Sequence, residues 1–365
     1  MPGGLSVIFT PKYTSICIVP RELCNIWTLR FKYFSRYLEE SELTSHIVLI
    51  SDVPTVSEEL LKLVHSEEYI NTIRELSCSG VEGFLDLGDT RYYPNVYNDL
   101  LVLVGGSIKA ADMVAQGLTL HSYNPYGGLH HARRARAAGF CIFNDVAIVA
   151  RYLQRHYGFE KIAIVDIDVH HADGTQELFY NDPTVLVVSV HAYGDFFYPG
   201  TGLTSEIGEG RGEGYTINIP LPLGSGDDVF KTAIDILPYI IESYSPDIIL
   251  VQAGVDGLKE DTLGKLNLTV NSYMYAAKVI HEISHNVCNG LTVSFGGGGY
   301  SGVNSAKAMI AFIYELSKPL KKQIEMNVLK IIGRVEETKS NINHIRRVEN
   351  VIRELKERIK WVKWG

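Results

Sequence analysis

Short apolar runs alternate with longer segments of helical period along most of the chain. The runs are rich in Val, Ile and Leu without intervening polar positions, which is typical of strands buried on both faces of a parallel sheet. They occupy residues 5–10, 46–51, 161–167, 184–190, 247–254 and 291–297. The helical segments occupy residues 105–116, 144–158, 227–244, 272–287 and 305–317. This alternation predicts an α/β domain with a central, mostly parallel sheet and helices on both faces.

Residues 318–365 follow a different pattern. After Pro319 the sequence is poor in glycine and rich in charge. Its apolar residues recur at the spacing of a heptad seam, at Ile345, Val348, Ile352, Leu355, Ile359 and Val362. We therefore predict a folded body, residues 1–317, and a basic C-terminal helical extension, residues 318–365. The favoured interpretation is a helix that packs on its own domain, and the alternative is a self-association helix that makes a homo-oligomer.

The charge is unevenly distributed between these two parts. The whole chain has a formal net charge of −8, which argues against nucleic acid as a direct partner. Residues 317–365 carry 13 Lys and Arg against 6 Asp and Glu, whereas residues 1–316 carry 21 against 36. An acidic body favours cationic substrates such as lysine-rich peptides or polyamines, and the basic tail is most simply a solvated helix face.

Neither a membrane segment nor a disulfide framework is expected. We find no apolar run of about 18 residues, the length that spans a bilayer, and the first residues lack the pattern of a secretory signal. A cytoplasmic protein is therefore predicted. The five cysteines form no C-x-x-C pair, which favours reduced, mostly buried thiols over disulfides or a cysteine metal site; they are Cys17, Cys24, Cys78, Cys141 and Cys288.

The densest group of ionisable residues follows the apolar run at 161–167. Asp166, Asp168 and His170 share one face if the strand stays extended, and two buried carboxylates beside an imidazole are costly unless a cation compensates them. Oxygen and imidazole donors together suit Zn²⁺ or Fe²⁺. Asp256 follows the run at 247–254; alone it is often a helix cap, but beside this group it supplies a third ligand and leaves a coordination position open.

A pair of adjacent histidines provides a candidate general base. His130 and His131 follow two glycines that allow close backbone approach. Two aspartates and one histidine place more negative charge on the metal than three histidines would. A water molecule bound to the metal is then less acidic, so a strong general base is needed beside it. Asp166 and Asp173 are available to orient one imidazole each, although adjacent histidines can also be incidental surface residues.

A run of four glycines, residues 296–299, precedes Tyr300. The run lacks the spacing of phosphate-binding loops. A tyrosine on such a pliable loop can lean over a metal and donate a hydrogen bond to a carbonyl oxygen as it becomes an oxyanion.

These motifs together resemble the zinc-dependent histone deacetylase superfamily, and more closely its class I and acetoin-utilisation members. The resemblance runs from about residue 60 to about residue 310 and rests on GGLHHARRARAAGFCIFNDVA, DIDVHHADGTQELFY, FFYPGTG, VQAGVDGLKEDTLGKLNLT and GGGGY in family order. It implies an arginase/deacetylase-like catalytic domain that removes acetyl groups from acetyl-lysine side chains of proteins.

The resemblance also implies a role for each site residue. The zinc ligands would be Asp168, His170 and Asp256. Tyr300 would polarise the acetyl carbonyl, His131 paired with Asp173 would be general base and then acid, and His130 paired with Asp166 would support it. The positions that line the acyl-lysine tunnel are Gly139, Phe140, Tyr198 and Leu263, with Asp89 as a candidate rim carboxylate. The potassium ligands would come from Asp166, Asp168, His170, Ser189 and Val190 at one site, and from Phe179, Asp182, Val185 and Tyr215 at a second.

Three positions depart from the family pattern. Tyr198 stands where phenylalanine is usual, which makes one tunnel wall more polar, and Ser301 stands where asparagine is common. Trp27 falls where the arginine of an internal acetate channel is expected, with Arg21 and Arg30 as candidate substitutes.

Other functions remain open at this stage. The same tunnel suits an acetylpolyamine as well as an acetylated protein. A ureohydrolase with two manganese ions needs ligands for a second metal, and the sequence offers one site's worth. An inactive reader of acetylated partners would typically lose a ligand or the tyrosine, and all are present.

Overall fold

A computed structural model describes residues 3–318 and 321–365, so Pro319 lies outside the described residues. Its centre is an eight-stranded sheet in the order β2-β1-β5-β10-β9-β6-β7-β8 with every neighbouring pair parallel. The strands are β1 (Gly3–Ile8), β2 (Val48–Ile50), β5 (Thr119–Asn124), β6 (Ile162–Asp166), β7 (Val185–Tyr193), β8 (Thr216–Pro222), β9 (Ile248–Gln252) and β10 (Thr292–Phe295). A small antiparallel hairpin joins β3 (Gly83–Phe84) to β4 (Arg91–Tyr92).

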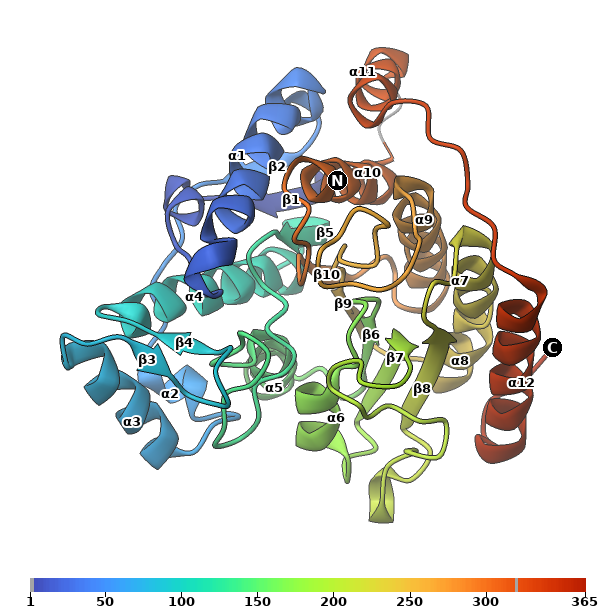
Figure 1. Cartoon of the computed structure of the whole chain (residues 1–365), viewed down its shortest axis with the longest axis horizontal. Coiled ribbons are helices and arrows are strands. Elements are labelled where there is room, and N and C mark those ends of the chain that lie inside the picture. The colour runs from blue at the N-terminus through green and yellow to red at the C-terminus, as the bar shows by residue number, and fades with distance from the viewer. Residues whose placement is uncertain (1–2, 319–320) are drawn as a thin grey trace.

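Helices cover both faces of this sheet (Figure 1). They are α1 (Cys24–Glu40), α2 (Glu58–Leu61), α3 (Glu67–Cys78), α4 (Val96–Ala115), α5 (Asp145–Tyr152), α6 (Asp173–Phe179), α7 (Asp227–Ile234), α8 (Leu237–Tyr244), α9 (Val270–Val287), α10 (Val303–Ser317), α11 (Lys322–Ile332) and α12 (Ile342–Arg358). Figure 1 shows α4, α5 and α6 on one side, and α7, α8, α9 and α10 on the other. The predicted α/β fold with a central parallel sheet is confirmed.

Two strands of the central sheet and one helix break are absent from the sequence prediction, as is the small hairpin of β3 and β4. The strand β5 reads TLHSYN, and its polar His121, Ser122 and Asn124 are buried between β1 and β10. Because polar residues interrupt the apolar pattern, no strand is predicted there or at β8. The predicted helix over 227–244 is two helices, since Pro238 lies at the start of α8, where a proline ring and its missing N–H cannot continue the preceding helix.

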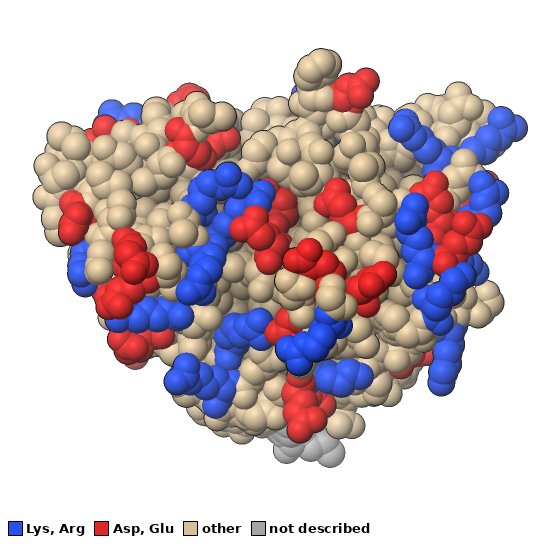
Figure 2. Space-filling view, turned by 90° about the horizontal axis from the view of Figure 1, so that it is seen from below, with Lys and Arg blue, Asp and Glu red and all other residues tan. Residues whose placement is uncertain are grey.

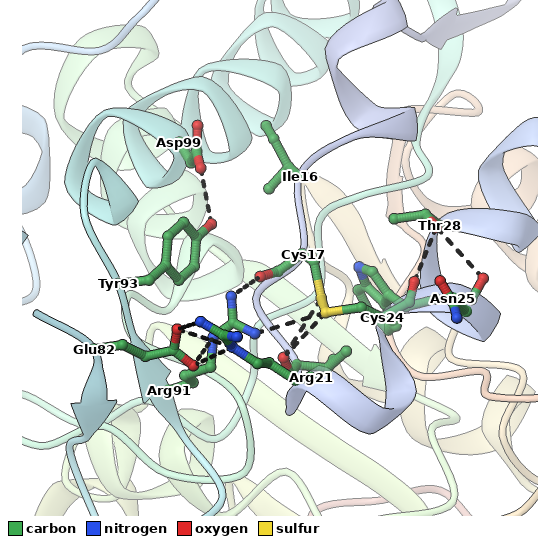
Figure 3. The surroundings of a disulfide bond; sticks show 12 residues. Ile16, Cys17, Arg21, Cys24, Asn25, Thr28, Glu82, Arg91, Tyr93 and Asp99 are labelled. Carbon is green, nitrogen blue, oxygen red and sulfur yellow. Dashed lines mark hydrogen bonds and ion pairs between the residues drawn. A yellow bond between two sulfur atoms is a disulfide. The ribbon is translucent and has the colours of Figure 1, made fainter.

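The prediction of reduced thiols is wrong for Cys17 and Cys24, which form a disulfide (Figure 3). The chain turns back through the short helical turn Arg21–Leu23 and brings their Cα atoms to 5.6 Å, within the range that a disulfide spans. A spacing of seven residues does not reveal this reversal. Cys141 and Cys288 are free and buried as predicted.

Arg91 on β4 holds the disulfide from the side (Figure 3). Its guanidinium donates to the Cys17 carbonyl at 3.5 Å and to the Cys24 sulfur at 3.7 Å. Glu82 pairs with both Arg91 and Arg21. The disulfide therefore ties the segment after β1 to the first residue of α1, the helix that carries the buried Trp27.

The C-terminal extension packs on the body of its own chain. α12 lies against β8 and α7, and four of the six seam residues are buried there, Val348, Leu355, Ile359 and Val362. On the face seen in Figure 2, Lys and Arg side chains crowd the right edge, the side on which Figure 1 places α12. The structure therefore agrees with the favoured interpretation, in which the C-terminal helix packs on its own domain. The homo-oligomer remains a prediction, and these four side chains are not available to form it.

The path between α11 and α12 is tied to the start of α7. Asp227 accepts a hydrogen bond from the Thr338 amide at 2.8 Å, and Asp228 accepts one from the Ser340 amide at 3.0 Å. In residues 3–318 and 321–365, no helix combines the length and the apolar character needed to cross a membrane.

Candidate active site

The carboxyl ends of β6, β9 and β10 meet at one pocket with a volume of about 320 Å³. Loops beyond the carboxyl ends of parallel strands are where α/β sheets place their ligands. The predicted site residues that line this pocket are Asp89, His130, His131, Gly139, Phe140, Asp168, His170, Tyr198, Asp256, Leu263 and Tyr300. Asp166 and Asp173 lie behind its two histidines.

Asp168, His170 and Asp256 converge as a potential metal centre. Each offers one ligand atom, and these atoms lie within 4.8 Å of one another. His170 Nδ1 is 3.0 Å from an Asp256 oxygen and 3.2 Å from an Asp168 oxygen. Two carboxylates and one imidazole, all facing one pocket, form a donor set that fits Zn²⁺ or Fe²⁺ with an open position.

The strand geometry expected for these ligands is wrong in one respect. β6 ends at Asp166, so Asp168 and His170 lie in the following loop rather than on an extended strand. The loop is shaped by the carboxylates themselves, because Asp166 accepts from the Asp168 amide at 3.1 Å and Asp168 accepts from the His170 amide at 3.0 Å. Asp256 accepts from the Val169 amide at 2.9 Å and fixes the loop to the end of β9.

Several groups that the sequence did not single out orient Asp168. Gln252 Nε2 and the Gly298 amide each donate to its Oδ2 at 2.8 Å. At Gly254 a Cβ atom would lie 2.0 Å from the same oxygen, so only glycine fits. The signal for Gln252 was a single polar residue at the end of an apolar run.

The two histidines each pair with one aspartate. His130 Nδ1 lies 2.7 Å from Asp166, and His131 Nδ1 lies 2.6 Å from Asp173. Burial lowers the pKa of His130, but Asp166 and Asp168 outweigh this effect and raise it to about 9. Burial and the neighbouring His130 lower the pKa of His131 to about 4, against the opposing effect of Asp173. At neutral pH, His131 is therefore free to accept a proton and His130 is not.

Two further charged residues hold the histidine segment, and sequence reasoning missed both. Arg133 donates to the second oxygen of Asp173 at 2.6 Å. The buried Asp145 accepts from the Gly128 and Leu129 amides at 3.0 and 2.7 Å. Asp145 starts α5, and an aspartate there reads in sequence as an ordinary helix-end residue.

Tyr300 leans into the pocket from the glycine loop. Its amide donates to Asp261 at 2.5 Å, and its ring stacks on Trp27 with centroids 5.5 Å apart. Asp261 also accepts from the Leu263 amide at 2.9 Å, so the same carboxylate places a tunnel residue. In the described part of the chain, the Tyr300 hydroxyl makes no hydrogen bond, which leaves it for a ligand in the pocket.

Aromatic rings form the walls of the pocket. Phe140 meets Tyr300 edge-on at 5.8 Å, and Tyr198 meets His131 edge-on at 5.0 Å. Phe197, which sequence reasoning missed, stacks on His170 with centroids 5.2 Å apart. Asp89 lines the pocket as a half-buried carboxylate, and burial and the nearby Asp86 raise its pKa to about 6.

The candidate channel arginine is Arg30 rather than Arg21. Arg21 is exposed and pairs with Glu82. Arg30 lies one helical turn after Trp27, is fully buried, and donates to the carbonyls of Gly297 and Gly299 at 3.0 and 3.2 Å. Its guanidinium carbon is 3.5 Å from the centre of the Trp27 ring. Its Nε and Nη2 are buried with no partner among the described residues.

The residues named for potassium fall into two neighbourhoods. Asp166 on β6 is the register partner of Ser189 on β7, and both side chains are buried next to Val190. In the second group the Phe179 carbonyl accepts from the Asp182 amide at 2.9 Å, and the other members are Val185 and Tyr215. Both potassium sites stay predictions.

His65 should make the protein less stable as the pH falls from about 6.5 to about 4. Its Nδ1 donates to the Arg133 carbonyl and its Nε2 accepts from the Asn144 amide, both at 2.9 Å, so the ring is held neutral. Burial lowers its pKa from 6.5 to about 4. The unfolded chain binds this proton first, so acid favours unfolding, by about 3 kcal/mol over the full window.

Urea unfolding at pH 7 and pH 4.5 measures this effect. His65→Gln should lose less stability between the two pH values than the wild-type protein. Carboxylate groups titrate in both proteins between these pH values. If both proteins lose the same free energy of unfolding, His65 makes no contribution of its own.

Fold and site together define an α/β protein with a carboxylate–imidazole group that could hold a metal, flanked by two His–Asp pairs. The family model of the histone deacetylase domain matches residues 28–316, and the chain belongs to this family. The resemblance found in the sequence is thereby confirmed.

Three relatives show what the chain is similar to. Acetoin utilization protein AcuC of Bacillus subtilis is 39% identical over 251 residues, which cover 67% of this chain and 65% of that protein. Histone deacetylase 10, chloroplastic, of Oryza sativa is 36% identical over 72% of this chain and 63% of its own length. A probable deacetylase of Archaeoglobus fulgidus is 38% identical over 71% and 70%. The chain thus spans slightly less than two thirds of the first two relatives.

Proposed function

We propose that this protein is a zinc-dependent amidohydrolase that removes acetyl groups from acetyl-lysine side chains of proteins. The observation that carries the proposal is the convergence of Asp168, His170 and Asp256 in one apolar-walled pocket with His131 and Tyr300. The family and its two relatives with deacetylase in their names support the same reaction.

The three ligands would hold the zinc ion, which supplies a Lewis acid that polarises the acetyl carbonyl and makes water more acidic. His131 keeps Nδ1 on Asp173, so its Nε2 takes a proton from the attacking water and later gives it to the leaving amine. The Tyr300 hydroxyl donates to the carbonyl oxygen as negative charge develops there. The charged His130 adds a fixed positive potential beside the reacting carbon.

The pocket walls favour an extended acyl-lysine. The methylene stem would lie between Phe140 and Tyr198, where aromatic rings exclude water from an apolar chain. Asp89, at the same pocket, would accept a backbone N–H of a peptide substrate. We assign Arg30 to the acetate product, because two nitrogen atoms of its buried guanidinium, Nε and Nη2, have no partners among the described residues and the group lies against the Trp27 ring beside Tyr300.

Chelation and metal replacement test the proposal. Turnover of an acetyl-lysine peptide should be lost after treatment with a strong chelator and restored by added Zn²⁺. Fe²⁺ fits the same donor set and should restore turnover as well. The surface variant His156→Gln serves as the control and should behave like the wild-type protein.

Three outcomes would redirect the assignment. Faster turnover of an acetylpolyamine than of peptides would make the small amine the substrate. A requirement for two Mn²⁺ ions would favour a ureohydrolase, and binding of the peptide without turnover would favour a reader. A structural potassium ion and a cytoplasmic location remain predictions of the sequence.

A further inference from the structure

Three histidines meet at the end of the sheet opposite the active site. His121 lies in the first half of β5 and is the register partner of Thr292, the first residue of β10. His281 and His285 lie in the last two turns of α9, which ends at Val287 just before β10 begins. The active site uses the carboxyl ends of these strands, so this cluster is a separate place in the fold.

The three imidazoles are close enough to share one ion. Each offers a ring nitrogen, and these atoms lie within 4.8 Å of one another. The ring centroids are 4.9 Å apart for His121 and His281, 5.3 Å for His121 and His285, and 4.6 Å for His281 and His285. Residues four apart on a helix lie on the same face, which is why the helical pair points at the strand histidine together.

The turn after α9 makes room for this arrangement. Gly290 has a φ of +85°, and a Cβ atom there would lie 2.8 Å from Cε1 of His285. Any other residue would be strained and would push the His285 ring out of the cluster.

The hydrogen bonding of the cluster is incomplete without a ligand. Nδ1 of His121 and Nδ1 of His281 are buried and have no hydrogen-bond partner among the described residues. Buried polar atoms without a partner are uncommon in folded proteins and often mark a ligand or ion.

Two of the three rings, those of His121 and His281, are also held in the neutral form that binds a metal. Burial, together with the two neighbouring histidines, lowers the pKa of His121 to about 3. Burial, His285 and Lys318 lower that of His281 to about 4. Lys318 itself is paired with Glu315 at 2.9 Å. Neutral imidazoles with free lone pairs are the form that binds transition metals.

We propose that His121, His281 and His285 bind a divalent transition-metal ion, with Zn²⁺ as the best match. Three nitrogen ligands suit Zn²⁺ in tetrahedral geometry, and the exposed His285 leaves the fourth position open to water. The last turn of a helix also favours a cation, because its free carbonyl groups carry partial negative charge. The ion would clamp α9 to β5 and so stabilise the sheet; the deacetylation machinery does not depend on it.

Zinc stoichiometry tests this proposal directly. After equilibrium dialysis against ZnCl₂, His281→Gln/His285→Gln should hold about one Zn²⁺ fewer per chain than the wild-type protein. Both positions are at least partly exposed, so the double variant should fold. His156→Gln, another exposed histidine on a helical segment, is the matched control and should keep the wild-type stoichiometry.

Two further readouts separate this site from the active site. The rise in Tm on adding Zn²⁺ should be smaller for the double variant than for the control, because a ligand that binds only the folded state stabilises it. Turnover of an acetyl-lysine peptide should be the same in both. Equal zinc content in the double variant and the wild-type protein would overturn the proposal, whether or not the protein is a deacetylase.

Discussion

Replacing Tyr300 by phenylalanine should lower kcat by about 10²- to 10³-fold, the scale for removing one oxyanion hydrogen-bond donor. The change deletes only the hydroxyl, so the stacking of the ring on Trp27 and its edge contact with Phe140 remain. KM should change little, because the hydroxyl acts on charge that develops in the transition state. Steady-state turnover of an acetyl-lysine peptide measures both constants.

Zinc content and stability distinguish this effect from damage to the fold. Tyr300 is not among the metal ligands, so the variant should keep the wild-type zinc content and Tm. Tyr239→Phe is the matched control, because that tyrosine is exposed and distant from the pocket in sequence and structure. Near-wild-type kcat in Tyr300→Phe would falsify the role assigned to the hydroxyl.

Replacing His131 by alanine should lower kcat by about 10²- to 10⁴-fold, the range for loss of a positioned general base. The change removes the only buried imidazole in the pocket whose pKa lies below its usual range and whose partner, Asp173, fixes its orientation. Asp173 keeps its ion pair with Arg133 at 2.6 Å, so no unpaired charge is left behind. Single-turnover measurements with an acetyl-lysine peptide report the chemical step itself.

His130→Ala is the informative comparison. Asp166 and Asp168 keep His130 protonated at neutral pH, so its loss removes a fixed charge and not a proton acceptor. Its effect on kcat should therefore be smaller than that of His131→Ala. A larger loss of kcat in His130→Ala than in His131→Ala would instead identify His130 as the general base.

Local sequence patterns predicted the elements whose side chains are uniformly apolar. β6 and β9 are five-residue strands with every side chain buried, and both coincide with runs of Val, Ile and Leu. Asp168 was identifiable because several ionisable residues follow its apolar run, and Asp256 because it follows a second run and completes that group. The sequence did not reveal β5 because its polar residues interrupt the apolar pattern. Asn124, for example, is buried in this strand and donates to Ser107 at 2.9 Å, a contact that only the packing of α4 on the sheet provides.

Residues that act through contacts between distant segments could not be recognised from the local sequence. Gln252, Asp145 and Asp261 resemble ordinary polar residues until the loops that they hold are in place. The histidine cluster is a similar case: His281 and His285 are visible as a pair four residues apart, but only the sheet brings His121 to them. One turn of α1 separates Arg30 from Trp27, where the channel arginine was expected, and only the helix geometry shows that both side chains reach the same buried region.

The sequence by itself determined the parallel α/β sheet and the family, and it predicted the candidate metal ligands, the paired histidines and the tyrosine that the fold brings to one pocket. Residue type and short spacing are enough to indicate these features, because neither depends on contacts between distant segments. Only the tertiary structure decided that Cys17 and Cys24 are bonded, that the heptad seam packs on β8, and that Arg30 is the buried arginine. Each of these depends on distances between segments, and such distances are set by how the chain turns and packs rather than by the pattern within any one segment.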